Sequence, residues 1–240
     1  MSECIILAGG FGTRLRSVVS DVPKPMAPIG NRPFLELLMD YLIRFNYNHI
    51  VLSTGYMHEK IADHFGSTYR GASISYAVEH TPLGTGGGMR NALSQCSDED
   101  ITVLNGDTLF RIDYDDLRHF YHTHPTRLAV VLRQVEDTAR YGSVTTDCSD
   151  RISHFAEKED SHGFGTINGG IYMLNRSLLE EQPSDTAFSF EKDIMQKKYQ
   201  QEPFFAYTSG AYFIDIGVPD DYHRLVAEQA KESYPPKTTF

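Results

Sequence analysis

The stretch that decides the fold class lies near the N-terminus and reads Leu7-Ala8-Gly9-Gly10-Phe11-Gly12-Thr13-Arg14-Leu15. It follows an apolar run at residues 4–8, which predicts a buried strand that ends at the glycines. Glycines let the backbone approach a ligand closely and point successive N–H groups at phosphate oxygens. Arg14 in the loop and Lys24 in the following Pro23-Lys24-Pro25-Met26 are counter-charges suited to a triphosphate. The stretch therefore predicts a phosphate-binding loop at the edge of an open parallel sheet.

Two better-known glycine loops do not fit this stretch. A Walker loop needs Gly-Lys-Ser/Thr after its glycines, and the chain has none there. A dinucleotide-binding fingerprint would begin at Gly10 and Gly12, but its third glycine position is Leu15. A plain structural turn is the remaining alternative, and the two cations count against it.

Strands and helices alternate over the first 110 residues. Apolar patterning predicts strands at residues 4–8, 49–53, 73–78 and 101–104. It predicts helices at residues 33–45, 57–65 and 86–95, the last with Thr85 as its N-cap. The alternation favours an α/β fold, with a Rossmann-like mixed, mostly parallel sheet flanked by helices.

The second half of the chain is less regular. We expect helices at residues 114–124, 190–197 and 219–230, and strands at 128–133, 204–208 and 212–215. Residues 141–174 predict short strands and turns, and the last ten residues predict a frayed tail. One α/β domain with an inserted substrate-binding lobe explains this order more simply than two independent domains.

Composition excludes several classes of protein. The 240 residues carry 22 Lys and Arg against 32 Asp and Glu, a net charge of −10, which argues against a nucleic-acid partner. The apolar runs are far shorter than the roughly 18 residues of a membrane span, and the acidic start is unlike a signal peptide. Three cysteines, Cys4, Cys96 and Cys148, are too few and too far apart for a disulfide framework or a zinc site. We therefore expect a cytoplasmic protein without a membrane partner.

The chain resembles the sugar-phosphate nucleotidyltransferases (NDP-sugar pyrophosphorylases) in motifs spread over residues 3 to 230. Besides the two stretches quoted above, the matching motifs are Glu79-His80-Thr81-Pro82-Leu83-Gly84-Thr85-Gly86-Gly87, Asn105-Gly106-Asp107-Thr108, Phe155-Ala156-Glu157-Lys158, Asn168-Gly169-Gly170-Ile171-Tyr172, Ser189-Phe190-Glu191 and Asp215-Ile216-Gly217-Val218-Pro219-Asp220-Asp221-Tyr222. They occur in the family's order, and together they are highly specific. One departure is Gly169, where the family usually has alanine, and the missing methyl suggests a looser strand and a larger sugar pocket.

The resemblance implies an enzyme that joins a nucleoside triphosphate to a sugar 1-phosphate and releases pyrophosphate. It implies a single nucleotidyltransferase domain at residues 1–230, with nucleotide bound by 1–110 and sugar phosphate by 111–230, before a tail at 231–240. Family members are often dimers or larger, so a homodimer stays open.

The resemblance also assigns roles to individual residues. The residues assigned to catalysis are Arg14, Lys24, Asp107 and Asp215. The nucleotide-binding residues are Leu7, Ala8, Gly9, Gly10, Gly12, Thr13, Glu79, Gly84 and Thr85. The residues for the sugar phosphate are Glu157, Lys158, Asn168 and Gly170. Asp107 and Asp215 are assigned to Mg2+, which favours one or two carboxylates plus substrate phosphates, although 108 positions (215 − 107) separate them in the sequence.

Within the family, the short chain and the sequence of residues 23–29 are most similar to members that join GTP and D-glycero-α-D-manno-heptose 1-phosphate into GDP-heptose for surface polysaccharides. Mannose 1-phosphate as the sugar, or UTP, CTP or dTTP as the nucleotide, remain alternatives. Glu79 favours guanine, because a carboxylate accepts well from the two adjacent donors on that base's pairing edge.

Two other classes of function remain open. Asp113 and Asp115 form an Asp-x-Asp that metal-dependent glycosyltransferases use, although acidic residues before a helix more often complement its N-terminus. A non-catalytic nucleotide-sugar sensor is disfavoured, because every cation and carboxylate of the signature is present. His119, His122 and His124 are better explained as a solvated, partly aromatic helix end than as a metal site.

Overall fold

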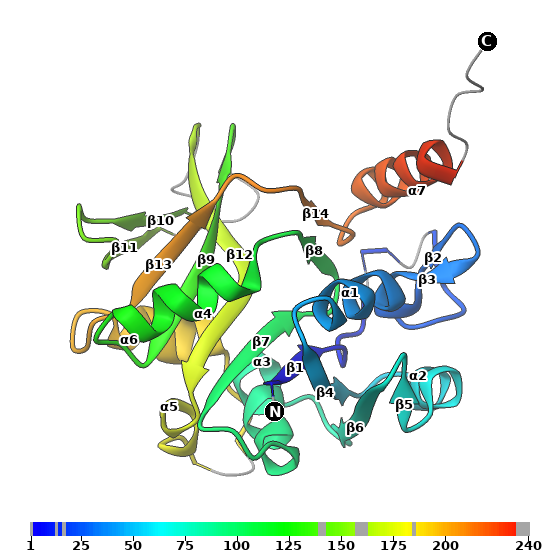
Figure 1. Cartoon of the computed structure of the whole chain (residues 1–240), viewed down its shortest axis with the longest axis horizontal. Helices are drawn as coiled ribbons and strands as arrows, with labels where there is room; N and C mark the ends of the chain where they lie inside the picture. The colour runs from blue at the N-terminus through cyan, green and yellow to red at the C-terminus, as the bar shows by residue number, and fades with distance from the viewer. Residues whose placement is uncertain are drawn as a thin grey trace.

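The computed structural model describes residues 2–12, 14–15, 18–138, 143–156, 163–183 and 186–233. Figure 1 shows a large twisted sheet with helices on both faces. The strands are β1 (Ser2–Leu7), β2 (Pro28–Ile29), β3 (Arg32–Pro33), β4 (Tyr47–Thr54), β5 (Thr68–Tyr69), β6 (Ala72–Val78), β7 (Asp100–Asn105), β8 (Thr108–Phe110), β9 (Leu128–Val135), β10 (Ser143–Thr146), β11 (Ile152–Ala156), β12 (Gly165–Asn175), β13 (Phe205–Ser209) and β14 (Phe213–Asp215). The helical elements are η1 (Lys24–Met26), α1 (Phe34–Ile43), α2 (His58–Phe65), α3 (Gly84–Ala92), η2 (Leu93–Gln95), α4 (Tyr114–Thr123), α5 (Ser177–Glu180), η4 (Phe190–Met195), α6 (Gln196–Lys198) and α7 (Pro219–Ser233).

The strand β1 lies in the interior of the large sheet, whose order is β13-β9-β12-β7-β1-β4-β6-β5. It is parallel to both of its neighbours, β7 and β4, and β4 is parallel to β6. The long strand β12 is antiparallel to β7 and β9, so the sheet is mixed. The expected α/β fold with a mixed, mostly parallel sheet is confirmed.

Alternate residues of β1 feed hydrophobic clusters on the two faces of the sheet. Ile6 belongs to the cluster that contains apolar side chains of α1, α4 and α7. Ile5 belongs to the cluster that contains side chains of α3, α5 and η4. Both isoleucines are fully buried, and each such burial is worth about 1.5–3 kcal/mol. Burial on both faces explains why β1 reads as a continuous apolar run rather than an alternating one.

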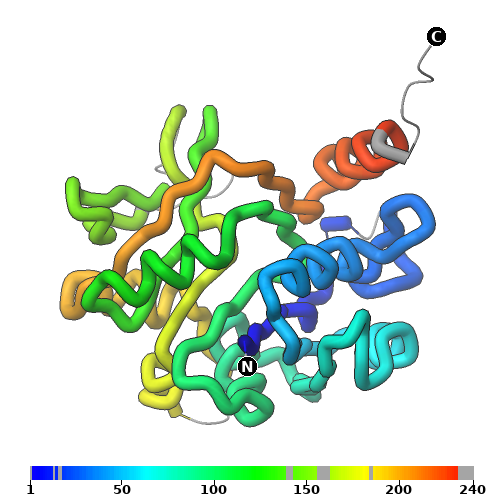
Figure 2. Tube along the Cα trace, viewed as in Figure 1, coloured from blue at the N-terminus to red at the C-terminus, as the bar shows by residue number. Residues whose placement is uncertain are grey.

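The chain passes from the first half of the molecule to the second and then returns. In Figure 2 the blue and cyan segments lie together, the green and yellow segments lie beside them, and red α7 returns to the blue part. The hydroxyl of Tyr222 in α7 donates a hydrogen bond to the Pro28 carbonyl at 2.7 Å. The late segment that carries Asp215 is thereby anchored against the N-terminal part of the chain.

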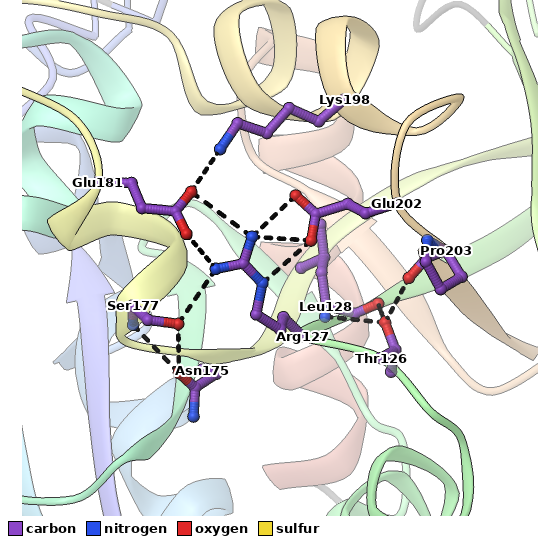
Figure 3. Close-up of polar contacts among 9 residues, drawn as sticks. All are labelled: Thr126, Arg127, Leu128, Asn175, Ser177, Glu181, Lys198, Glu202 and Pro203. Atoms are coloured by element: carbon purple, nitrogen blue, oxygen red, sulfur yellow. Dashed lines mark hydrogen bonds and ion pairs between the residues drawn. The ribbon is translucent and has the colours of Figure 1, made fainter.

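A cluster of matched charges holds the second half together; we call Arg127, Glu181, Lys198 and Glu202 the Arg127 cluster (Figure 3). The Arg127 guanidinium, just before β9, donates to Glu202 Oε2 at 3.0 Å from Nε and at 2.8 Å from Nη2. Its Nη1 donates to Glu181, which follows α5 and also accepts from Lys198 Nζ at 2.8 Å. Two cations thus meet two carboxylates and join three segments that are far apart in the sequence.

Three of the six expected helices, α1, α2 and α4, are confirmed within one or two residues at their ends. The expectation that Thr85 is an N-cap is wrong, because α3 begins at Gly84 after Leu83, and no capping side-chain bond is made there. The helix expected at residues 190–197 is instead a π-helix, η4, followed by α6. Residues 141–174 are also more regular than expected, since β12 is 11 residues long.

The short elements β2, β3, β5, β8 and α5 were not predicted, because two to four residues carry no readable periodicity. At the C-terminus α7 continues to Ser233, three residues beyond its expected end, and residues 234–240 of the expected tail lie outside the described residues. Across the described part of the chain, none of the helices has both the length and the apolar character that crossing a membrane requires.

Candidate active site

The glycine loop and Asp107 leave the sheet at the same edge. Strands β1 and β7 are parallel, and their last residues, Leu7 and Asn105, are directly paired. The Gly106 amide donates to the Leu7 carbonyl at 2.9 Å, which holds the two chain exits together. Because carboxyl ends of parallel strands share one edge, the loop after β1 and the aspartate after β7 face the same ligand space.

Asp215 reaches that edge through a small two-stranded sheet. Strand β14 pairs antiparallel with β8, and Asp215 lies opposite Thr108 in the register. The Ile216 amide donates to the Asp107 carbonyl at 3.0 Å. The two aspartates, 108 positions apart, are therefore brought together by backbone pairing, which the sequence pattern had not revealed.

Lys24 lies against both aspartates. Its Nζ is 2.5 Å from Asp107 Oδ2 and 3.8 Å from Asp215 Oδ1. The Lys24 side chain is 10% exposed, that of Asp215 20% and that of Asp107 34%, so the charges meet in a partly desolvated place. A Cβ on Gly12 would lie 2.9 Å from Lys24 Cβ, so the glycine loop packs directly on this lysine. The site thus joins one ammonium to two carboxylates beneath a phosphate-type loop.

Burial raises the pKa of Asp215 above its ordinary value, and the nearby charge of Asp107 raises it further. Three groups oppose that rise without cancelling it: the Lys24 ammonium, the Gly217 amide, which donates to Asp215 Oδ1 at 2.7 Å, and the positive charge of Arg14. An excess of negative charge in a buried place attracts a further cation.

The pair of aspartates suits magnesium better than a metal that needs several protein ligands. Among the described residues no group of three or more His, Cys, Asp or Glu side chains could hold a metal ion. Magnesium needs only one or two carboxylates, with water and substrate phosphates completing its octahedron. Asp107 and Asp215 therefore fit a magnesium ion whose other ligands are water and phosphate oxygens.

Two cavities adjoin this edge of the sheet. The larger, about 520 Å³, is lined by the glycine loop, by Glu79 and by Gly84 and Thr85 at the start of α3. The smaller, about 210 Å³, is lined by Gly12, Arg14 and Lys24. Leu7, Gly10 and Asp107 line both. The expected catalytic cations thus lie around the smaller cavity, while Glu79 lies in the larger one.

Glu79 is half-buried in the larger cavity, and each of its carboxylate oxygens accepts one hydrogen bond from the chain. Ser53 Oγ donates to Oε1 at 2.9 Å, and the Leu83 amide donates to Oε2 at 3.2 Å. A carboxylate accepts about four hydrogen bonds, so capacity remains on both oxygens. The carboxylate is therefore held in place and still able to accept from a ligand.

A chain of hydrogen bonds connects Thr85 with the strand that carries Asn168. Glu191 Oε2 accepts from Thr85 Oγ1 at 2.6 Å, and its Oε1 accepts from the Tyr172 hydroxyl at 3.2 Å. The Asn168 amide donates to the Tyr172 hydroxyl at 2.7 Å, while Asn168 Oδ1 accepts from the Gly170 amide at 2.9 Å. Sequence reasoning did not select Tyr172 or Glu191 as site residues, although both stand inside the motifs that carried the resemblance.

Gly170 and Gly169 have different surroundings. Gly170 has φ +72, and a Cβ on it would lie 2.6 Å from Asn105 Nδ2, so this part of β12 adjoins the edge where β7 ends. A Cβ on Gly169 would lie 2.7 Å from Phe110 Cε1 and 3.0 Å from the Val131 carbonyl oxygen. The space of the missing methyl is filled by the buried Phe110 ring, so the expected larger sugar pocket does not follow from this departure.

Residues 3–232 match the family described as nucleotidyl transferase. The chain belongs to this family. The nucleotidyl transferase is 44% identical over 226 residues to D-glycero-alpha-D-manno-heptose 1-phosphate guanylyltransferase of Aneurinibacillus thermoaerophilus, covering 94% of this chain and 97% of that protein. It is 39% identical over 224 residues to the protein of the same name from Campylobacter jejuni, covering 93% and 98%. The crystal structure of HddC from Yersinia pseudotuberculosis complexed with GMP-PN is similar with a TM-score of 0.83 at 37% identity, covering 95% of this chain and all of that one.

Three of the residues expected in the site of this transferase, Thr13, Glu157 and Lys158, lie outside the described residues. The remaining expected residues lie along the two cavities or in the hydrogen-bond chain that ends at Asn168 and Gly170, except Asp215, which lines neither cavity and lies 3.8 Å from Lys24 Nζ. The structure thus brings Lys24, Asp107 and Asp215 together at one edge of the sheet, which the sequence alone did not show, while the roles of the site residues stay predictions.

The acidic residues and histidines of residues 113–124, which were not assigned to the site, have structural explanations. Asp113 is the N-cap of α4, where its carboxylate accepts from the amides of Asp115 and Asp116. Asp115 pairs with Arg118 on the same helix. The His124 ring lies 4.1 Å from the Phe120 ring between centroids, so it belongs to an aromatic helix end. The expected N-terminal role of the acidic residues and the expected aromatic helix end are confirmed.

Proposed function

We propose that this nucleotidyl transferase joins GTP and D-glycero-α-D-manno-heptose 1-phosphate to give GDP-heptose and pyrophosphate. The observation that carries the proposal is the contact of Lys24 with both Asp107 and Asp215 at the edge where the glycine loop ends β1. The names of the two relatives at 44% and 39% identity support the choice of nucleotide and sugar.

The reaction is a displacement at phosphorus. An oxygen of the sugar phosphate attacks the α-phosphorus of GTP, a new phosphorus–oxygen bond forms, and the bond to the β-phosphate oxygen breaks with release of pyrophosphate. The attacking oxygen is already ionised, so no side chain has to remove a proton. The main obstacle is repulsion between two anions, which positioning and charge neutralisation overcome.

The residues around the smaller cavity would neutralise the triphosphate. Arg14 and Lys24 are suited to hold its oxygens and the departing pyrophosphate, with the amides of Gly10 and Gly12 as further donors. Asp107 and Asp215 would hold magnesium, which supplies positive charge to the phosphates when bound. The raised pKa of Asp215 is consistent with a carboxylate pair that is under-neutralised until such a cation is present.

The larger cavity would hold the nucleoside. Leu7, Ala8, Gly84 and Thr85 would contact it by backbone and apolar atoms. Glu79 would accept from the two donors on the guanine edge, because both of its oxygens retain acceptor capacity. A uracil or thymine edge offers one donor between two acceptors, which suits a carboxylate less well.

The sugar phosphate would be bound from the second half of the chain. We propose that Lys158 holds its phosphate and that Glu157, Asn168 and Gly170 contact its hydroxyls. Tyr172 and Glu191 support this assignment from behind, because their hydrogen bonds hold Asn168 in place. Residues 1–110 would thus bind nucleotide and residues 111–230 sugar phosphate.

Cytoplasmic location fits the cysteines Cys4, Cys96 and Cys148, which are all free thiols. Neither a nucleic acid nor a membrane is required as a partner, and a homodimer can be tested by sedimentation. The glycosyltransferase alternative has lost its main support, because Asp113 is engaged with the amides of its own helix.

A substrate panel tests the proposal. GTP, UTP, CTP and dTTP are combined with the 1-phosphates of the heptose, mannose, glucose and N-acetylglucosamine, and pyrophosphate release is recorded. We expect the highest kcat/KM for GTP with the heptose 1-phosphate and the next highest for GTP with mannose 1-phosphate. Consumption of GDP-heptose without pyrophosphate chemistry would contradict the proposal and favour a glycosyltransferase.

A further inference from the structure

Phe11 is a large apolar side chain left exposed at the mouth of the larger cavity. It is 50% exposed, and Val18 and Phe164 are the other large apolar side chains that are comparably exposed among the described residues. Of these three, Phe11 is the one that lines the 520 Å³ cavity. An exposed apolar ring that faces a cavity has surface available for a ligand to cover.

Tyr56 holds one side of the Phe11 ring. The two ring centroids are 5.8 Å apart and the planes are tilted by 44°. Tyr56 lies two residues beyond the end of β4, is half-buried, and lines the same cavity. The glycine loop after β1 and the loop after β4 thus contribute one aromatic side chain each to a common wall, and we call Phe11 and Tyr56 the aromatic wall.

The division of the two cavities indicates what this wall faces. Arg14 and Lys24 line the smaller cavity, which suits phosphates, while Glu79 lines the larger one. Gly10 lines both, and Phe11 is the next residue, so the aromatic wall begins where the phosphate space meets the larger space. A planar base that presents its edge to Glu79 still has two apolar faces to bury, and an aromatic ring is a suitable surface for one of them.

We propose that Phe11 packs its ring on the nucleoside of the bound triphosphate and that Tyr56 is the positioning residue that holds Phe11 there. The 44° tilt means that only one of the two rings can lie flat on a planar ligand, and Phe11 has the more exposed face. Stacking is tolerant of base identity, so Phe11 adds affinity for the nucleotide while Glu79 discriminates between bases. This inference rests on the proposed function and assigns a further residue to its nucleotide site.

Steady-state kinetics of pyrophosphate release test the assignment. Phe11→Ala is expected to raise the KM for GTP roughly tenfold with kcat nearly unchanged, because the contact is made equally in the ground state and the transition state. In Phe11→Ala the KM for sugar 1-phosphate and the ratio of kcat/KM for GTP to kcat/KM for UTP should stay unchanged. In Glu79→Gln that ratio should fall. Phe11→Tyr retains the ring and should restore a near-normal KM. Tyr56→Ala should raise the KM for GTP, but by less than Phe11→Ala does. Tyr56→Phe should leave the KM for GTP unchanged.

The sequence contains no tryptophan, so a single introduced indole reports on the site directly. Phe11→Trp is expected to change its emission saturably when GTP is added without sugar phosphate, and not when inorganic tripolyphosphate is added. Phe164→Trp is the matched control, since Phe164 is 75% exposed and does not line the larger cavity. Its emission should not respond to either probe.

The outcomes separate this inference from the proposed function. If the wild-type chain turns over GTP but Phe11→Ala leaves its KM within twofold and Phe11→Trp emission is unchanged at saturating GTP, the role of Phe11 is wrong and the proposed function stands. If GTP changes the emission of Phe11→Trp but no sugar phosphate yields pyrophosphate, the aromatic wall binds a nucleoside and the proposed reaction is wrong. An equal response of Phe11→Trp to tripolyphosphate would overturn the inference, because it would report phosphate binding alone.

Discussion

The Arg127 cluster and the Lys24 site, which consists of Lys24, Asp107 and Asp215, both join cations to carboxylates. They differ in charge balance and in what lies beside them. In the Arg127 cluster two cations meet two carboxylates, with the guanidinium donating to both partners (Figure 3). In the Lys24 site one ammonium meets two carboxylates, and the site borders both cavities. The first arrangement is complete within the chain, and the second leaves negative charge for an incoming cation.

The pKa values of the carboxylates express this difference. The contacts with Arg127 and Lys198 lower the pKa of Glu181 to about 2, because both cations favour its ionised form. Burial and the charge of Asp107 raise the pKa of Asp215. A matched cluster therefore stabilises the fold, whereas the excess negative charge of an unmatched one is expected to be neutralised when the proposed metal and substrate bind.

The largest expected effect is on turnover at the unmatched site. Asp107→Asn and Asp215→Asn should each lower kcat/KM for pyrophosphate release by at least about 10³-fold, roughly 4 kcal/mol, because each removes a charge that would hold magnesium. The matched control is Glu202→Gln in the Arg127 cluster, which should leave the rate within about twofold. Near-normal rates for either aspartate variant in magnesium would contradict the assignment of the site.

Glu79 extends the comparison to a carboxylate held by neutral donors, Ser53 Oγ and the Leu83 amide. Glu79→Gln keeps the size of the side chain but places an N–H where an acceptor stood. The preference for GTP over UTP should fall about tenfold or more, since a hydrogen bond to a charged group is worth about 1.5–3 kcal/mol. A competition assay with both nucleotides measures the ratio, and an unchanged ratio would remove Glu79 from base recognition.

The Arg127 cluster should affect stability and not turnover. Arg127→Met keeps the aliphatic stem but leaves Glu181 and Glu202 without their shared guanidinium. The free energy of unfolding should fall by about 1–2 kcal/mol, since the side chains are partly exposed. Urea denaturation measures this, and kcat/KM at 25 °C should be unchanged. A large loss of activity with unchanged stability would show that the two clusters are not independent.

The two clusters should also respond oppositely to pH in magnesium-free protein. Because the folded pKa of Glu181 is lowered, its stabilising contribution is present above its ordinary value of 4.5 and is lost as pH falls towards about 2. Because the folded pKa of Asp215 is raised, its charge lowers stability at neutral pH, and that penalty disappears as pH falls through the raised value.

Thermal unfolding in EDTA between pH 3 and 8 checks both signs. Asp215→Asn should raise Tm at pH 7 by a few degrees and lose that advantage in acid, while Glu181→Gln should lower Tm at pH 7 and converge on wild type in acid. A lower Tm for Asp215→Asn at pH 7 would contradict the charge excess at the Lys24 site.

Local patterns predicted much of this structure. The glycine loop after a buried strand, the alternation of strands with helices and the place of Asp113 at a helix N-terminus follow from residues close together in the sequence, and they are confirmed. The N-cap role expected for Thr85 was wrong, because its hydroxyl donates a hydrogen bond to Glu191, 106 positions away, rather than capping its own helix. The meeting of Asp107 and Asp215 depends on the pairing of β8 with β14. A strand at the position of β14 was expected, but the three-residue β8 was not, and no local signal shows that the two strands pair.

The most direct test of the central claim is the dependence of turnover on magnesium. Pyrophosphate release from GTP and D-glycero-α-D-manno-heptose 1-phosphate is measured in EDTA and across a magnesium titration. We predict no release in EDTA and a saturable rise with magnesium in the wild type and in Arg127→Met, with no comparable rise in Asp107→Asn. Release at the full rate in EDTA, or the same magnesium dependence in Asp107→Asn as in wild type, would contradict the claim that this half-buried pair of carboxylates recruits the cation needed to join two anions.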